Sequence, residues 1–328
     1  MKNRIEKILQ NRELNLGFLI FILLIIVTIR APKFLELSNV ERIVNDTAIL
    51  IMVASGQLLV ILTGGIDLSV GSTIAFSGMA ASMMNQYYPG IPVYLVLLSG
   101  ILIGTALGAF NGVCVAFGKI PPVITTLGTM SIFRGLTFVM SKGQWVTAHE
   151  MTESFMNIPK GRFFLIPNLT AWAILICIIM FYFIRYTRHG REIYAIGGNK
   201  TAAHFVGVSE KKVNFMVFTI LGALCGLAGV MWTARYAAAV NETAAGFELQ
   251  TVAACVLGGV SMAGGAGALT GVIMGSLFLG IINNALPVVN LSPFYQMAIQ
   301  GFVVLTAIVA NVLMEQRNEK QLLNRRRQ

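Results

Sequence analysis

Two long stretches of the chain, residues 68–118 and 249–314, contain no Asp, Glu, Lys or Arg. Each is far longer than the roughly 20 apolar residues that one membrane-spanning helix needs, so each is expected to fold back across a bilayer. Hydrophobic residues make up 56% of the 328-residue chain and charged residues only 12%, which is not the composition of a soluble domain. The sequence therefore predicts an all-α, polytopic integral membrane protein.

Breaks at Gly, Pro, Asn and charge clusters divide the chain into ten predicted spans. The first, LGFLIFILLIIVTI, resembles the core of a signal peptide, but Arg30, Pro32 and Lys33 follow it in place of a small-residue cleavage site, so it is expected to be retained. The whole of 1–328 is interpreted as a single transmembrane domain with short tails at 1–15 and 315–328. The predicted spans are 16–30, 43–63, 70–86, 92–117, 121–141, 168–186, 213–236, 250–263, 268–287 and 294–314.

The distribution of Lys and Arg predicts which loops face the cytoplasm. Both termini are basic, and ten crossings bring both to the same side, so both are expected to be cytoplasmic. The same alternation places residues 187–212 inside and the loop at 142–167 outside. The net charge of +10 then reflects positive loops held against an anionic lipid bilayer, which explains it better than nucleic-acid binding.

Residue types that carry enzymatic or metal chemistry are sparse. The cysteines, at 114, 177, 225 and 255, lie in apolar spans without paired spacing and are interpreted as packing residues, and the three histidines fall in loops on opposite sides of the membrane. The nearest approach to a phosphate loop, GVCVAFGK at 112–119, has one residue too many between its glycines and Ile120 in the Ser/Thr position. We therefore expect no catalytic residue, no cofactor and no metal site in this chain.

Uncharged polar side chains inside the predicted spans are candidates for a substrate path, because in hydrocarbon they need partners or a water-filled cavity. Amides and hydroxyls offer both donors and acceptors, which suits a neutral sugar or polyol better than an ion. The alternative is that the amides only bond neighbouring helices. The candidates are Gln57, Asn111, Thr125, Asn283 and Asn284, together with Thr126 and Gln300.

Small residues and two charges also have predicted roles in the spans. Glycines recur every fourth residue from 100 to 112 and predict a face that packs closely on another helix; those at 222, 226 and 229 and at 271 and 275 are interpreted in the same way. Asp67 is expected to cap the helix that begins near Val70. Arg134, about midway along its span, either faces a cavity or indicates that the span is shifted.

The basic, glycine-punctuated segment 187–212 is longer than connections without a role usually are. Within it, AAHFVGV at 202–208 has helical potential, with small residues on one side and Gly207 near its end. This pattern suits a short helix seated in a groove of another protein. The alternative is a solvated loop that merely carries positive charge on the cytoplasmic side.

Four motifs in order along the chain resemble the permease subunits of bacterial ribose-type ABC sugar importers. They are GGIDLSVGS at 64–72, FNGVCVAFGKIPPVITTLGTM at 110–130, RHGREIYAIGGNKTAAHFVGV at 188–208 and FELQTVAACVLGGVSMAGGAGALTGVIMGSLFLGIINNAL at 247–286. The resemblance implies a transport subunit of the bacterial inner membrane, working as a pair of permeases with two ATPase subunits that bind ATP and Mg. It also implies a periplasmic sugar-binding protein that delivers the substrate.

The same resemblance implies that the third motif contacts the ATPase subunit, through Gly190, Arg191, Gly197, Asn199, Ala202, Ala203 and Gly207. Gln250 stands where family members often carry Asp, which leaves the sugar open among pentoses, deoxyhexoses and the autoinducer-2 furanose. The pairing of permeases, as a homodimer or with a similar second chain, is also left open. The expected mechanism is alternating access, in which the ATPase moves residues 187–210 and tilts the spans around a neutral polar path.

Three other functions remain as alternatives. A branched-chain amino-acid permease is the closest rival within the same superfamily. An ion- or proton-coupled sugar carrier would need intramembrane carboxylates or ion ligands, which the charge-free stretches do not offer. A membrane enzyme would need clustered acidic or histidine residues near one membrane face.

GGIDLSVG at 64–71 and GGVSMAGG at 258–265 also share glycine pairs, which suggests a faint internal repeat and flexible gate elements.

Overall fold

The computed structural model of the chain describes residues 12–288 and seven single positions between 295 and 309. Most of the predicted tenth span, 294–314, lies outside the described residues, and so does Gln300. The long helices are α2 (Arg12–Arg30), α3 (Leu37–Leu62), α4 (Val70–Tyr87), α5 (Val93–Ala116), α6 (Pro122–Ser141), α8 (Asn168–Tyr186), α11 (Glu210–Tyr236) and α13 (Leu269–Val288).

Short elements connect these helices, most of them at the two ends of the bundle. The helical ones are η1 (Pro32–Leu35), η2 (Ala148–Glu150), α7 (Glu153–Lys160), α9 (Arg188–Gly198), α10 (Lys200–Phe205) and α12 (Phe247–Leu257). Two antiparallel pairs of two-residue strands complete the fold: β1 (Val146–Thr147) with β4 (Ala238–Ala239), and β2 (Arg162–Phe163) with β3 (Ile166–Pro167).

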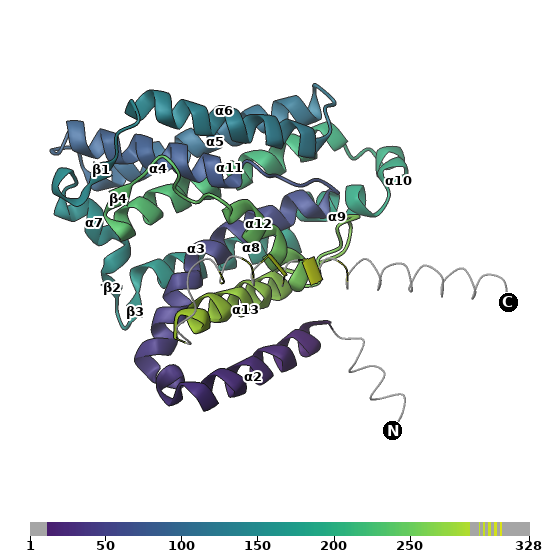
Figure 1. Ribbon diagram of the computed structural model, residues 1–328. Coiled ribbons are helices and arrows are strands. Elements are labelled where there is room, and N and C mark those ends of the chain that lie inside the picture. Colours follow the sequence, from purple (N-terminus) through teal and green to yellow (C-terminus); the bar gives the residue numbers. More distant parts are fainter. Residues whose placement is uncertain are drawn as a thin grey trace.

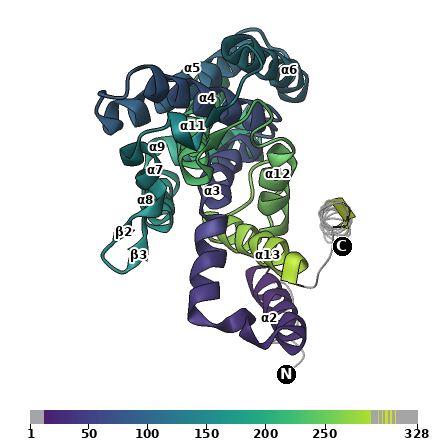
Figure 2. The same cartoon turned by 60° about the vertical axis from the view of Figure 1, so that its left-hand side comes forward.

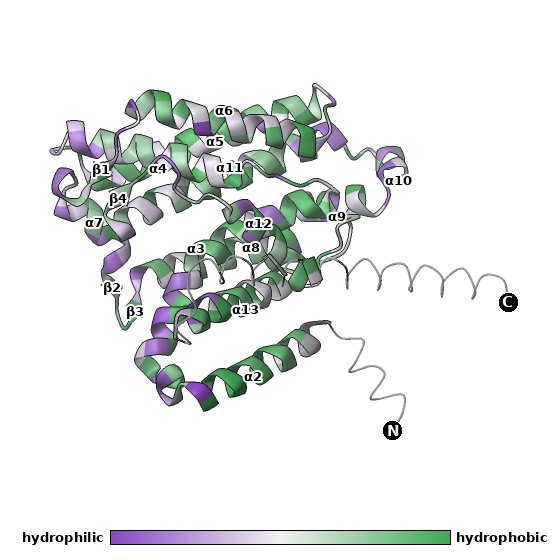
Figure 3. Ribbon diagram, in the orientation of Figure 1, coloured by the Kyte–Doolittle hydropathy of each residue, from purple (hydrophilic) through white to green (hydrophobic). Residues whose placement is uncertain are grey.

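Six helices of the described part are long and apolar enough to cross a bilayer: α3, α5, α6, α8, α11 and α13. The chain is therefore an all-α, multi-pass membrane protein. Apolar residues cover the sides of the helices, and polar residues gather toward the two ends of the bundle (Figure 3). The apolar faces of α5, α6 and α8 are mostly exposed, as expected for helices that border lipid.

The two ends of the bundle are distinct (Figure 1). We call them the α7 end, which carries α7 and the four strands, and the α10 end, which carries α9 and α10. A Cβ placed on Gly17 would lie 3.3 Å from the Met274 methyl group, so the start of α2 lies beside the start of α13. The start of α13 in turn follows residues 258–268, which contact α9. The described N-terminal residues therefore lie at the α10 end.

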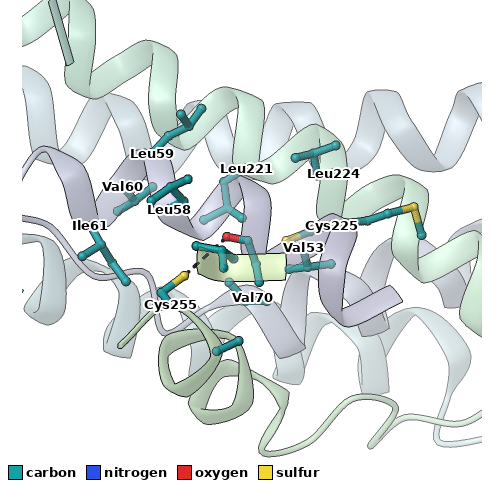
Figure 4. Close-up of a cluster of buried hydrophobic side chains, with 14 of the residues drawn as sticks. Val53, Leu58, Leu59, Val60, Ile61, Val70, Leu221, Leu224, Cys225 and Cys255 are labelled. Carbon is teal, nitrogen blue, oxygen red and sulfur yellow. Dashed lines mark hydrogen bonds between the residues drawn. The ribbon is translucent and has the colours of Figure 1, made fainter. Parts of the chain in front are cut away.

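Helix α3 runs through the middle of the molecule, with α11, α8, α12 and α13 around it (Figure 2). Its residues from 47 to 62 are all buried. Figure 4 shows Val53, Leu58 and Leu59 of α3 packed with Leu221 and Leu224 of α11. The thiol of Cys255 lies in the same cluster and donates a hydrogen bond to the Ala54 carbonyl at 3.4 Å.

The glycine pattern produces a close helix contact between α5 and α11. A Cβ placed on Gly104 would collide with the Gly222 carbonyl oxygen, and a Cβ on Gly108 would collide with the Phe218 carbonyl oxygen. The predicted close-packing face at residues 100–112 is confirmed, and its partner is the second predicted glycine group. Gly271 and Gly275 meet the backbone of α12 in the same manner.

The predicted span at 250–263 is wrong. Helix α12 ends at Leu257, and its 11 residues rise only about 16 Å, roughly half the thickness of a hydrocarbon core. Residues 258–268 continue as turns in which Gly259, Gly264, Gly265 and Gly267 have positive φ. The apolar stretch is long enough for a span by hydropathy alone. The helix nevertheless ends, because the glycines that follow adopt backbone conformations that L-residues rarely adopt.

Candidate functional site

The chain between α11 and α12 turns back into the bundle. It leaves α11 through Ala237, in the left-handed region, pairs with β1 and enters α12 after Gly246, whose φ is +80°. A Cβ placed on Gly71, in the first turn of α4, would collide with the Ala244 carbonyl oxygen. The returning segment 237–246 therefore reaches the level at which α4 begins, and α12 starts inside the bundle. Such half-helices expose free backbone N–H groups at membrane depth and often border substrate sites.

Helix α6 holds the returning segment in place. The Nη1 of Arg134 donates to the carbonyl oxygens of Asn241 and Thr243, at 2.8 and 2.9 Å. At the last residue of α6, Ser141 Oγ donates to the side-chain oxygen of Asn241 at 2.6 Å. The span of α6 is therefore not shifted, and Arg134 satisfies carbonyl groups that an unwound segment leaves without helical partners.

A cavity of about 470 Å³ opens on the other side of this segment. Its volume lies within the usual range for small-molecule sites. Four parts of the chain form it: the middle of α3, the end of α11, residues 242–250, and α13. The lining residues are Asp46, Thr47, Ile49, Leu50, Trp232, Arg235, Tyr236, Glu242, Ala244, Ala245, Phe247, Gln250, Gly280, Asn283 and Asn284.

The lining combines aromatic rings, amides and a paired charge. Trp232 and Phe247 meet edge to face, with ring centroids 5.1 Å apart. The guanidinium of Arg235 is paired with Asp46 and also donates to the Asn45 carbonyl at 3.0 Å, which fastens the end of α11 to the first half of α3. Because that pair is neutral overall, Glu242 leaves the lining with a small negative charge. Rings, amides and little net charge suit an uncharged, hydroxyl-rich molecule.

Of the five predicted path residues, the structure brings Asn283 and Asn284 together in this cavity. Asn284 donates from Nδ2 to the Gly280 carbonyl at 3.0 Å, which leaves its side-chain oxygen for other contacts. Gln57 and Thr125 are buried elsewhere, and neither the Gln57 amide nor the Thr125 hydroxyl has a hydrogen-bond partner among the described residues. Sequence reasoning missed Trp232 and Gln250 as cavity residues, because only tertiary packing brings α11, which carries Trp232, and α12, which carries Gln250, to the same cavity as α13.

Asn111 belongs to a separate buried polar cluster at the start of α4. Its Nδ2 donates to Ser69 Oγ at 2.8 Å and approaches Asp67 Oδ2 at 3.4 Å. Asp67 accepts from the N–H and the hydroxyl of Ser69, both at 2.7 Å. The expected capping role of Asp67 is therefore wrong, because the first-turn N–H groups of α4 receive no side-chain cap. The carboxylate stabilises the turn before the helix and anchors it to α5.

The segment 187–212 forms α9 and α10, which fold against the α10 end of the bundle. Thr187 caps α9 by accepting from Gly190 N at 3.1 Å, and Asn199 caps α10 by accepting from Ala202 N at 2.9 Å. A Cβ placed on Gly197 would collide with the Leu62 carbonyl oxygen, so α9 touches the end of α3 directly. The segment is therefore folded rather than a loose loop.

The glycine loop 258–268 fits between α9 and α3. Tyr194 donates its hydroxyl to the Gly267 carbonyl at 2.7 Å, and Gly265 N donates to the Leu62 carbonyl at 2.9 Å. A Cβ placed on Gly264 would approach Gly64 N at 2.9 Å, so the two glycine motifs noted in the sequence lie against each other. A movement of α9 would therefore be transmitted to both loops.

The seven predicted partner-contact residues divide into two groups. Gly190 and Ala203 are buried and Gly197 is packed on backbone, so these three face their own chain. Arg191, Asn199, Ala202 and Gly207 are exposed. Arg191 has no ion-pair partner in the described part of the chain, whereas its neighbour Glu192 is paired with Arg188 at 2.7 Å.

Two residues that sequence reasoning missed are the most exposed apolar groups of this segment. Phe205 is 83% exposed and Val206 is 77% exposed, at the end of α10. Two adjacent apolar residues inside an otherwise polar, basic segment were the available signal. An apolar tip at a bundle end, beside exposed polar groups, has the character of a protein-contact surface.

Comparisons with known proteins find similar sequences along most of the chain. Residues 39–308 match the family described as "Branched-chain amino acid transport system / permease component". The ribose import permease of Bacillus subtilis is 39% identical over 290 residues, covering 88% of this chain and 89% of the relative. The D-allose permease of Escherichia coli K12 is 36% identical over 90% of both chains, and the autoinducer 2 permease of Klebsiella pneumoniae is 31% identical over 95% of this chain and 89% of its own. No solved structure matches the chain.

Proposed function

The chain belongs to this family of transport permeases, and from that premise we propose that it is the membrane-spanning subunit of an ATP-driven importer for a monosaccharide. The observation that carries the proposal is the similarity to permeases named for ribose, allose and L-arabinose along about nine-tenths of the chain. The chain is a transport component of the inner membrane, and it is not expected to hydrolyse ATP itself. A branched-chain amino acid, which the family description names, is the competing substrate.

The cavity beside α12 supports a neutral sugar as the transported molecule. Asn283 and Asn284 offer amides, Trp232 offers a ring, and the Asp46–Arg235 pair carries no net charge. A free amino acid carries an ammonium and a carboxylate, which would need separate buried counter-charges. The proposed path therefore runs through this cavity, with Gln57, Asn111 and Thr125 as further path residues when the spans tilt.

The proposed complex contains two permease subunits, two ATPase subunits that bind ATP and Mg, and a periplasmic sugar-binding protein. In this complex the α10 end and both termini are cytoplasmic. Of the ten proposed crossings, one is made by the returning segment 237–246 together with α12 in place of a continuous helix, and one lies beyond residue 288. The ATPase contacts α10 through Phe205 and Val206, aided by Arg191, Asn199 and Ala202. Since α9 touches α3 and the glycine loop 258–268, ATP-driven movement of α10 would tilt the helices around the cavity.

The partner surface can be tested by a matched pair of double variants. Phe205→Ser with Val206→Ser should reduce co-purification of the ATPase about tenfold or more, since two exposed apolar contacts are lost at a central position. Phe164→Ser with Leu165→Ser removes an equally exposed pair, 88% and 85%, at the α7 end. Equal ATPase recovery from both variants would exclude α10 as the contact.

Substrate and energy source can be tested by uptake in cells that express the complete transporter. We expect uptake of a labelled pentose or hexose, no uptake of labelled leucine, and little effect of a proton ionophore while ATP is maintained. Asn283→Leu and Asn284→Leu should each lower sugar uptake with normal accumulation of the permease. Leucine uptake would establish the amino-acid alternative, and loss of sugar uptake with the ionophore alone would establish a gradient-driven carrier.

A further inference from the structure

A second cavity, of about 370 Å³, lies at the α10 end, away from the proposed sugar path. It is formed by the turn after α3, the connection between α5 and α6, and the start of α11, with Lys200 of α10 at its edge. The lining residues are Thr63, Gly64, Gly65, Val115, Ala116, Lys119, Ile120, Pro121, Pro122, Lys200, Glu210, Lys211 and Asn214.

The charges of this cavity are strongly uneven. Three lysines line it, at 119, 200 and 211, against one carboxylate, Glu210. Lys200 is paired with Glu210 at 2.7 Å, while Lys119 and Lys211 have no ion-pair partner within the part of the chain that the structure describes. Asn214 adds an amide donor one turn further along α11. Two lysines without ion-pair partners that line one concave surface favour an anion with several oxygen acceptors.

The surroundings of the cavity indicate which anion fits. Beside Lys119, exposed apolar side chains continue from the α5–α6 connection onto α6: Phe117 is 56% exposed, Ile120 41% and Ile124 63%. These side chains border lipid, so an anion in the cavity lies at the level where headgroups end and acyl chains begin. A soluble anion would make no favourable contact with these apolar side chains. An anionic phospholipid would contact the lysines through its headgroup and the apolar side chains through its acyl chains.

We infer that this cavity binds the phosphate of an anionic phospholipid, with its acyl chains along α5 and α6. The headgroup contacts Lys119 of the α5–α6 connection and Lys211 at the start of α11, and reaches the edge of α10 through Lys200. A lipid bound there would contact both α10, the helix proposed to bind the ATPase, and the start of α6. The inference concerns lipid binding alone and does not depend on which solute is transported.

The test uses the full chain, purified in detergent and delipidated, with lipid binding measured by native mass spectrometry. Dioleoyl phosphatidylglycerol should bind more tightly than dioleoyl phosphatidylcholine. Lys119→Gln with Lys211→Gln should weaken phosphatidylglycerol binding about 25-fold, because each lysine near an anionic lipid contributes about a factor of five. Glu210→Gln should strengthen binding, because it removes the competing carboxylate and frees Lys200.

Two further variants separate this site from general charge and from misfolding. Lys142→Gln with Lys160→Gln removes two exposed lysines at the α7 end and should leave phosphatidylglycerol binding unchanged. Lys119→Arg with Lys211→Arg keeps the charge and should retain binding. Equal losses in the two Gln pairs, or no loss in either, would overturn the inference. Displacement of phosphatidylglycerol by millimolar glycerol 3-phosphate would also overturn it, in favour of a soluble anion.

Discussion

Arg134 should be the residue whose loss most directly releases the segment beside the sugar cavity. It is a charged residue in a lipid-bordering helix, and its guanidinium donates to two carbonyl oxygens of the unwound segment. Arg134→Met keeps the apolar stem of the side chain and removes both hydrogen bonds. We expect the segment 237–246 to leave its position more often and sugar uptake to fall.

The magnitude follows from two opposing terms. A hydrogen bond to a charged group contributes about 1.5–3 kcal/mol, so losing two costs about 3–6 kcal/mol. Removing a guanidinium from membrane depth recovers about 2.5–3.5 kcal/mol. The central difference is about 1–2 kcal/mol, which corresponds to roughly a tenfold shift toward the released segment. Arg134→Lys keeps a cation and should fall between the wild type and Arg134→Met.

A cysteine at position 243 reports the release directly. Thr243 is only 4% exposed, so Thr243→Cys should react slowly with a maleimide when Arg134 is present. In a background with Cys114→Ala and Cys177→Ala, Arg134→Met should raise the labelling rate about tenfold and lower sugar uptake in parallel. Permease accumulation, measured on the same membranes, reports whether the variants insert normally.

The control removes another arginine that is tied to a distant part of the chain. Arg162 pairs with Glu41 at the α7 end with more than half of its side chain exposed, and such surface pairs contribute about 0–1 kcal/mol. Arg162→Met should therefore leave labelling at position 243 unchanged. If Arg134→Met labels and transports like the wild type, the two hydrogen bonds do not hold the segment and the reasoning is refuted.

Three further predictions concern packing, the buried amide and topology. Gly104→Ala should reduce the stability of the purified permease by about 1–3 kcal/mol, because its Cβ would collide with α11, whereas Gly135→Ala, with open space around it, should have no such effect in a thermal melt. Gln57→Leu should raise the melting temperature of the permease, because it removes a buried amide that has no hydrogen-bond partner among the described residues. The same variant should lower sugar uptake if Gln57 borders the path in another conformation, and unchanged uptake would make Gln57 a packing residue. A cysteine at the exposed position 144 should react with an impermeant reagent added from outside, and a cysteine at the exposed position 201 should react only when the reagent is added from inside. Reversed labelling would contradict the proposed orientation.

The sequence by itself determined the class of protein and the positions of most helices. The length of an apolar stretch, the distribution of charge and the spacing of glycines are local properties of the sequence. A bilayer stabilises an apolar helix of sufficient length whatever that helix packs against. For this reason the spans at 92–117, 121–141 and 168–186 agree with α5, α6 and α8 to within one residue at each boundary. The close-packing glycine face was predictable for the same reason, because only small residues allow two backbones to touch.

The tertiary structure alone decided where the chain leaves the helix and which side chains meet there. Hydropathy could not distinguish the half-helix α12 from a full span, because its residues are as apolar as those of a crossing. The partners of Arg134 lie 107 and 109 residues further along the chain, a separation at which no local pattern carries information. Likewise Ala203 faces inward and Phe205 outward because of how α10 folds onto the bundle. The cavity is formed by contacts between segments that are distant in the sequence, so its lining residues could be identified only from the tertiary structure.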